Sequence, residues 1–222
     1  MNAEITDFIS RCDLCATYQS TQQTEPLISH EIPERPWEKI GVDIFTWEEK
    51  NFLCTADYYS NYFEVDRLKK KDVPEITKRL KRHFSTHGIP DKVVSDNSPF
   101  NSKEFEQFAK DYEFEHVTSS PTYAQSNGKV ENAIKTAKRL MKKAKESGVD
   151  FYLALLDWRN TPSEGFQSSP VQRMFGRRTR TLLPMASSLL KPKTEEGAKD
   201  KLYIIGKGCQ RQRRQGVIYH HC

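Results

Sequence analysis

The chain has 222 residues, enough to bury a sizeable core in one domain with appended segments. Hydrophobic residues make up 36% and charged residues 29%. No apolar run approaches the roughly 18 residues that a membrane span needs, so we expect no membrane partner. The net charge of +5 is moderate, and it separates a nucleic-acid binder from an ordinary basic enzyme only weakly. Five scattered cysteines and the absence of a secretory signal in "MNAEITDFIS" predict reduced thiols and an intracellular protein.

The first 36 residues predict two short segments ahead of the main domain. Residues 1–22 contain the pair Cys12 and Cys15, and residues 23–36 are polar and proline-bearing, which is typical of a linker. From Trp37 onwards, apolar and aromatic runs are broken by short polar turns: "WEKIGVDIF", "NFLCTADYYS" and "YFEVDRL". These runs predict three sequential strands in an antiparallel meander.

Helices and strands then alternate along the chain. The stretch from Asp72, an expected N-cap, to Gly88 predicts a helix, which the strand "DKVVSDN", the helix "SKEFEQFAKDYE" and the strand "FEHVTSS" follow. Within the first helix, His83 and His87 are interpreted as a surface pair rather than a metal site. Strands that alternate with helices indicate crossovers and a partly parallel sheet. We therefore expect an α/β, RNase H-like fold with a five-stranded mixed sheet flanked by helices.

The remaining sequence predicts a basic helix in "GKVENAIKTAKRLMKKAK", a second helix around "DFYLALLDWRNTP", and a basic, loosely ordered tail over residues 185–222. The main domain accordingly spans residues 37–184. The basic helix has Lys129, Lys135, Lys138, Arg139 and Lys142 as candidate contacts to DNA phosphates. Gln125 and Asn127, just before it, are either DNA contacts or part of a helix-capping turn.

Three acids occupy places that this topology brings together. Asp43 lies inside an apolar strand, Asp96 ends the fourth strand, and Glu131 lies in the first turn of the basic helix. Singly, each has an ordinary explanation as a strand-end acid, a turn former and a first-turn acid that the helix dipole favours. Together, three converging carboxylates predict a site for Mg²⁺ or Mn²⁺ and two-metal phosphoryl transfer.

Five segments resemble retroviral-type integrases, most closely those of the gypsy-like LTR retrotransposon lineage: "RPWEKIGVDIF", "DYYSNYFEV", "HGIPDKVVSDNSPFNSKEF", "SSPTYAQSNGKVEN" and "RNTPSEGFQSSPVQRMFGRR". The resemblance covers about residues 5–184. It implies that Asp43, Asp96 and Glu131 are the metal-binding catalytic triad of a polynucleotidyl transferase that processes DNA 3′ ends and joins them to a target. It further implies DNA donor ends and target DNA as partners, a homo-oligomer and a nuclear location.

The chain departs from the family pattern at three points. "DNSPFN" has Ser98 where the family has glycine, and the 34 residues between Asp96 and Glu131 are one fewer than the resemblance implies. "YAQSNG" has Tyr123 and Ala124 in place of histidine and proline. Cys12 and Cys15 match the second half of a His-His-Cys-Cys zinc module, but residues 1–11 contain no histidine.

Two thiolates do not close a Zn²⁺ site, which takes four ligands. Residues 1–22 are therefore interpreted as a partial zinc-module remnant, continued upstream or lost, or as a chance CxxC. Two alternatives to the integrase activity stay open. One is a catalytically silent, domesticated DNA-binding or protein-interaction module that keeps the fold, and the other is a nuclease that hydrolyses strands without joining them.

Overall fold

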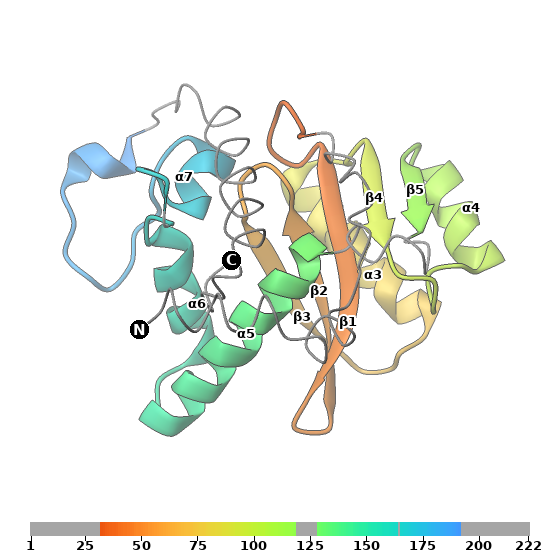
Figure 1. Cartoon of the computed structure of the whole chain (residues 1–222), viewed down its shortest axis with the longest axis horizontal. Helices are drawn as coiled ribbons and strands as arrows, with labels where there is room; N and C mark the ends of the chain where they lie inside the picture. Colours follow the sequence, from red (N-terminus) through yellow and green to blue (C-terminus); the bar gives the residue numbers. More distant parts are fainter. Residues whose placement is uncertain (1–31, 119–127, 164, 192–222) are drawn as a thin grey trace, which may run out of the picture. The chain divides into compact units, whose positions relative to one another are not determined.

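A five-stranded mixed sheet forms the centre of the computed structural model, which describes residues 32–118, 128–163 and 165–191. The strands lie in the order β3-β2-β1-β4-β5 (Figure 1). The first three, β1 (Lys39–Trp47), β2 (Lys50–Asp57) and β3 (Phe63–Leu68), form the predicted antiparallel meander. Strand β4 (Lys92–Ser95) pairs in parallel with β1, and β5 (Glu115–Thr118) pairs in parallel with β4. The predicted fold class is confirmed.

Two helices cover one face of the sheet. Helix α3 (Val73–His87) begins where the Asp72 side chain accepts a hydrogen bond from the Glu75 amide at 3.0 Å, and it ends at Gly88, whose φ of 97° favours glycine. Helix α4 (Lys103–Asp111) begins in the same way, with Ser102 as its N-cap. The buried stripe of α3 is mainly aliphatic and that of α4 mainly aromatic, and both belong to a core that includes the strand residues Ile40, Val42, Leu53 and Val93.

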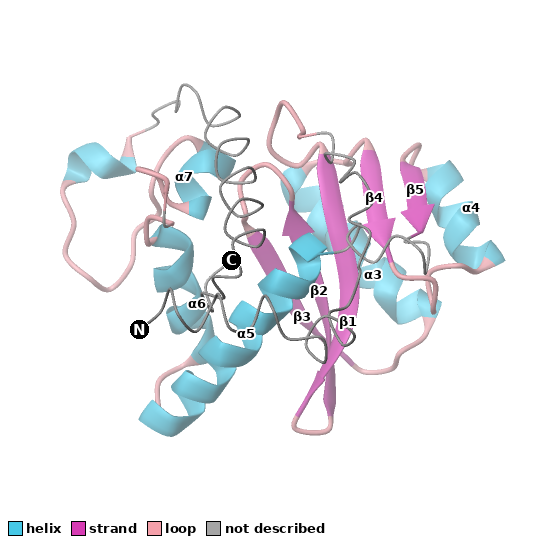
Figure 2. Ribbon diagram, in the orientation of Figure 1, coloured by secondary structure: helices cyan, strands magenta, loops and turns pink. Residues whose placement is uncertain are grey.

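The opposite face is covered by α5 (Gly128–Ser147) and α6 (Phe151–Asn160). Side chains alternate along a strand, so Phe45 of β1 and Cys54 of β2 point away from α3 and pack under α5. Helix α5 contacts both of these strands, and Figure 2 shows it lying across them. Its buried residues follow helical spacing: Val130, Ala133, Ile134, Ala137, Met141 and Ala144.

The chain beyond α6 packs back onto the β2–β3 turn. Helix α7 (Pro170–Phe175) begins with a capping box between Ser169 and Gln172, and a short 3₁₀ helix, η2 (Ser187–Leu190), follows. Arg173 of α7 is buried, and its guanidinium donates to the Ser60 carbonyl at 2.9 Å and to the Ser168 carbonyl at 2.6 Å. These contacts tie α7 to the end of the sheet.

The interpretation of His83 and His87 as a surface pair is wrong. His83 is 2% exposed and lies between the Thr55 hydroxyl, at 3.1 Å from Nδ1, and the Asp66 carboxylate, at 2.7 Å from Nε2. The His87 ring is also buried, with Nε2 at 3.0 Å from Glu64 Oε1. His83 lies seven residues after Ile76 and three after Leu80, so it belongs to the buried stripe of α3.

Several sequence predictions fall outside the described residues. They are the zinc-module remnant with Cys12 and Cys15, most of the linker, most of the basic tail, and the pair Gln125 and Asn127. The domain boundaries therefore stay predictions. Among the helices that the structure describes, none is long and apolar enough to cross a bilayer.

Candidate active site

Asp43 and Asp96 lie side by side because of the register of the parallel pair β1 and β4. Val42 of β1 is the partner of Ser95 of β4. Asp43 follows Val42 in the sequence, and Asp96 follows Ser95. Val42 and Val93 point toward α3 and α4, so the strand alternation directs Asp43 to the α5 face, and Asp96 directly follows the last residue of β4. Two acids that lie far apart in the sequence thus meet where the parallel pairing ends.

Glu131 approaches the same place from the helix above. Val130 is fully buried against the sheet, and successive helical residues are about 100° apart around the axis, so Glu131 lies at one edge of the buried stripe. Lys129 lies at the other edge. Glu131 is exposed, as is Asp96, whereas Asp43 is half-buried.

The environment of Asp43 disfavours its charge. The pKa of Asp43 is raised to about 6, mainly by burial and also by the negative charges of Asp96 and Glu131, whereas a hydrogen bond from the Ile44 amide and the charge of Lys138 oppose the rise. The amide nitrogen of Ile44 lies 2.6 Å from Asp43 Oδ1. The charges of both other acids of the predicted triad therefore act on Asp43.

The backbone around Asp96 is held by buried neighbours. His116 of β5 lies with Nε2 at 2.8 Å from Ser95 Oγ, and Ser95 Oγ donates to the Asp96 carbonyl at 3.0 Å. Burial lowers the pKa of His116, which favours a neutral ring. Downstream, Phe100 is fully buried among the aromatic residues of α4. Ser98 is not among the described residues with positive φ, so serine causes no backbone strain at this position.

Oxygen ligands from three carboxylates are the donor set that Mg²⁺ or Mn²⁺ prefers, and the raised pKa of Asp43 shows that a nearby cation would be favourable. However, the described part of the chain contains no group of three or more His, Cys, Asp or Glu side chains gathered closely enough to hold a metal ion as they stand. The donor chemistry fits a divalent cation, and the side-chain arrangement is open. Closing it requires movement of the two exposed carboxylates, Asp96 and Glu131.

A basic stripe runs along α5 from Glu131. Lys135, Lys138 and Lys142 follow Glu131 by four, seven and eleven residues, so all lie within about 40° of it around the helix axis, and Arg139 lies about 80° away. Lys135, Arg139 and Lys142 are exposed. Lys138 is half-buried, with Nζ 5.7 Å from the centre of the Phe45 ring, and its charge acts on Asp43. The stripe therefore connects the acid cluster with open surface.

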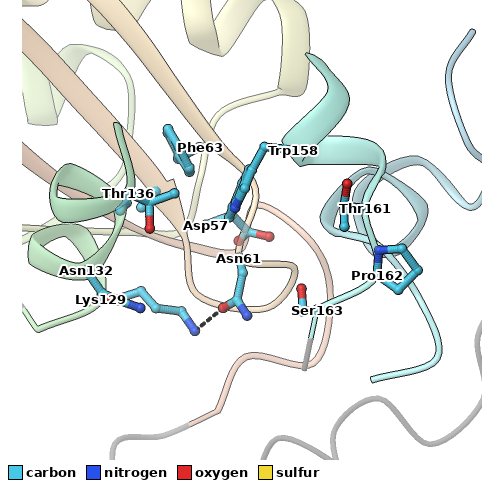
Figure 3. A pocket seen from close by; sticks show the side chains of 12 residues that line it. Asp57, Asn61, Phe63, Lys129, Asn132, Thr136, Trp158, Thr161, Pro162 and Ser163 are labelled. Carbon is cyan, nitrogen blue, oxygen red and sulfur yellow. Dashed lines mark hydrogen bonds between the residues drawn. The ribbon is translucent and has the colours of Figure 1, made fainter. Parts of the chain in front are cut away.

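Lys129 does not belong to this stripe. Lys129 is half-buried, and its ammonium group donates a hydrogen bond to Asn61 Oδ1 in the β2–β3 turn. Burial lowers the pKa of Lys129 to about 8, although the nearby Asp57 carboxylate opposes the decrease. Lys129 and Asn61 line a pocket of about 340 Å³ (Figure 3). Sequence reasoning missed this pocket, and the available signal was the position of Lys129 on the opposite side of Val130 from Glu131.

Sequence comparison finds relatives that include polyproteins of retroelements. An uncharacterised protein of Caenorhabditis elegans is 30% identical over 199 residues, which are 86% of this chain and 15% of that protein. The retrovirus-related Pol polyprotein of the Drosophila melanogaster transposon gypsy is 28% identical over 129 residues, 56% of this chain and 12% of the polyprotein. The chain thus spans less than a fifth of the length of these relatives. No protein-family model matches it.

Solved structures share the fold. A chain of the simian T-cell lymphotropic virus intasome superposes with a TM-score of 0.62 at 19% identity, covering 88% of this chain and 71% of that one. The catalytic core domain of BIV integrase gives 0.54 at 17% identity, covering 62% and 93%. The HTLV-2 integrase catalytic core domain, in a dimeric form in complex with magnesium, gives 0.51 at 21% identity, covering 64% and 98%. The chain is thus similar in sequence to a part of retrotransposon polyproteins, and it has the fold of the retroviral integrase catalytic core domains.

Proposed function

We propose that the protein is a divalent-metal-dependent polynucleotidyl transferase that processes DNA 3′ ends and joins them to a target strand. The observation that carries the proposal is the adjacency of Asp43 and Asp96, together with the action of the charge of Glu131 on Asp43. The parallel register of β1 and β4 makes the two aspartates neighbours, and the charge of Glu131 acts on Asp43. The magnesium in the structure of the related HTLV-2 core supports a divalent ion for this chain.

In this proposal, Asp43 is the fixed ligand because its strand is paired on both sides. Asp96 and Glu131 are exposed, and rotation of their side chains brings their oxygens toward Asp43. A bound pair of divalent ions supplies Lewis-acid activation of the attacking oxygen and stabilisation of the leaving oxygen. The residues of this chain hold the ions and position the DNA.

DNA positioning is assigned to the basic stripe of Lys135, Lys138, Arg139 and Lys142. Lysine and arginine side chains bind phosphates without reading the bases, so we expect largely sequence-independent and salt-sensitive affinity. Glu131 lies at one end of the basic stripe, so a DNA strand that lies along the stripe has one end at the acid cluster. DNA donor ends and target DNA are the proposed partners, and an oligomer is proposed because related structures are an intasome and a dimeric core. A nuclear location follows from this activity.

A second candidate function is a catalytically silent DNA-binding module. The observation that favours it is the open arrangement of the acids, since no group of three potential ligands in the described ranges is gathered closely enough for a metal. Joining of a branched DNA substrate in Mg²⁺ or Mn²⁺ separates the two functions. A transferase joins strands and loses the reaction on Glu131→Gln, whereas a silent module binds the DNA and yields no product.

A further inference from the structure

The pocket beside the first turns of α5 lies on the opposite flank of the helix from Glu131. Lys129 and Glu131 are about 160° apart around the helix axis, and Val130 separates them on the buried side. The pocket has a volume of about 340 Å³, with walls from the β2–β3 turn, α5 and the segment that follows α6 (Figure 3). It is therefore distinct from the acid cluster.

The half-buried Lys129 supplies a positive charge, and its ammonium group can donate more hydrogen bonds than the one described. An ammonium has three N–H donors, and the hydrogen bond described for it goes to Asn61 Oδ1. The Asp57 carboxylate is nearby, but it already accepts hydrogen bonds from the Trp37 amide at 2.9 Å and from the amide and hydroxyl of Ser60 at 2.8 and 2.5 Å. Its charge is thus shared among other donors.

Two further polar groups of the lining have donors to offer. Asn61 accepts from Lys129 through Oδ1, which leaves its amide nitrogen as a donor. Ser163 Oγ accepts from Arg173 Nη2 at 3.1 Å, so the hydroxyl proton of Ser163 can be donated elsewhere. Arg173, which is 5% exposed, adds a second, buried positive charge behind this wall. The lining therefore combines several hydrogen-bond donors and the charge of Lys129 with one carboxylate, that of Asp57, whose charge is already engaged by the donors named above.

We propose that this pocket binds a phosphate group through the Lys129 ammonium, the Asn61 amide and the Ser163 hydroxyl. A lysine ammonium with neighbouring neutral donors is a common arrangement for phosphate oxygens, since every contact is a donor to an acceptor-only ligand. The phosphate belongs either to a nucleic-acid backbone or to a free phosphate-bearing compound. The backbone source rests on the proposed function and adds a DNA contact on the flank of α5 away from the basic stripe.

The substitution Asn61→Asp tests the proposal without removing the fold. Asn61 has a φ of 63°, a backbone conformation that aspartate also tolerates. Aspartate gives Lys129 a permanent counter-charge, so the phosphate-free protein is at least as stable, but the added negative charge repels phosphate. Lys129→Met removes the charge, and Lys78→Gln, at an exposed position of α3, is the matched control for loss of a lysine.

The readout is the melting temperature of the full chain in inorganic phosphate, compared with chloride at equal ionic strength. At a tenfold excess over Kd, wild type and Lys78→Gln should gain about 3 °C, and both pocket variants should lose this gain. An equal gain in all four proteins, or none in wild type, overturns the proposal.

Fluorescence anisotropy with a DNA duplex identifies the source of the phosphate. If it is the backbone, Asn61→Asp weakens DNA binding at least about fivefold, in line with the loss of one phosphate contact, and phosphate competes with DNA. If the phosphate belongs to a free compound, Asn61→Asp loses the phosphate-dependent gain in melting temperature, but its affinity for DNA equals that of wild type. Neither readout requires catalysis, so a failure to join DNA strands counts against the proposed function and leaves this test intact.

Discussion

Asp43 and Asp96 each lie one residue beyond a paired position of the parallel strands β1 and β4, because Val42 is the register partner of Ser95. The antiparallel partner of Asp43, on its other side, is Cys54 of β2, which is fully buried under α5. Asp43 thus lies between a buried apolar neighbour and a second acid. This position accounts for the unfavourable environment of its charge and for its proposed role as the fixed metal ligand.

Replacement of Asp43 by asparagine should stabilise the metal-free protein. The pKa of Asp43 in the folded state is about 6, above the usual 3.8, so folding becomes less favourable as pH rises from about 4 to 6, and the full penalty is present at pH 7. Asp43 is partly exposed, so we expect a gain of about 1 to 2 kcal/mol for Asp43→Asn at pH 7. Urea unfolding measures it, and the gain should disappear near pH 4. A loss of stability at pH 7 would contradict the assigned environment.

Divalent ions should stabilise the wild type through the same carboxylates. At a hundredfold excess over Kd, a ligand that binds the folded state adds about 2.7 kcal/mol, which corresponds to roughly 5 °C in melting temperature for a domain of this size. Thermal unfolding in Mn²⁺ should show this increase for wild type, and Asp43→Asn should abolish it. An increase that persists in the variant would place the metal elsewhere.

Glu64 should support stability at neutral pH and lose that contribution in acid. Burial by itself raises the pKa of Glu64, but hydrogen bonding to His87 and the positive charge of Arg159 outweigh it and hold the pKa at about 2, below the usual 4.5. Arg159 Nη2 lies 2.8 Å from Glu64 Oε2. Because the folded-state pKa is lowered, the contribution is complete above about pH 4.5 and decreases as pH falls toward 2.

The variant Glu64→Gln should therefore lose about 2 to 4 kcal/mol of unfolding free energy at pH 7, because it leaves the largely buried Arg159 without its carboxylate. Denaturant unfolding at several pH values measures the difference. The exposed Glu104→Gln on α4 serves as the control and should change stability little. A difference between wild type and Glu64→Gln that stays constant down to pH 2 would argue against the assigned ion pair.

The basic stripe predicts a specific salt dependence. Each phosphate contact contributes about 0.9 to the slope of log affinity against log salt concentration, so Lys135→Gln and Lys142→Gln should each lower it by about 1. Anisotropy titrations from about 50 to 200 mM salt measure it, with Lys78→Gln as the control. Slopes that match wild type in both variants would remove α5 from the DNA interface.

Much of the fold could be predicted because local signals agree with the tertiary structure. Asp72 and Gly88 delimit α3 through capping, and the meander follows from apolar runs with short turns. The adjacency of Asp43 and Asp96 follows from topology alone, since a fourth strand added in parallel beside the first brings their ends together.

Other features depend on packing that the sequence pattern does not contain. His83 and His87 are polar residues on the apolar stripe of α3, and only the positions of Asp66 and Glu64 on β3 show why they can be buried. The direction of Lys129 depends on the β2–β3 turn, where Asn61 has a positive φ. Charge alone grouped this lysine with the candidate DNA contacts, although helical spacing puts it on the other side of Val130 from Glu131.

The measurement that tests the central claim most directly is a joining assay with a labelled, branched DNA substrate in Mn²⁺ or Mg²⁺, with Glu131→Gln and wild type side by side. Anisotropy on the same substrate reports binding separately. We predict joined product from wild type, at least about a thousandfold less from Glu131→Gln, and DNA affinity in the variant equal to or slightly above that of wild type, because one negative charge is removed. DNA bound by wild type without any joined product, or joining that survives Glu131→Gln, would contradict the assignment of the three acids as a catalytic metal site.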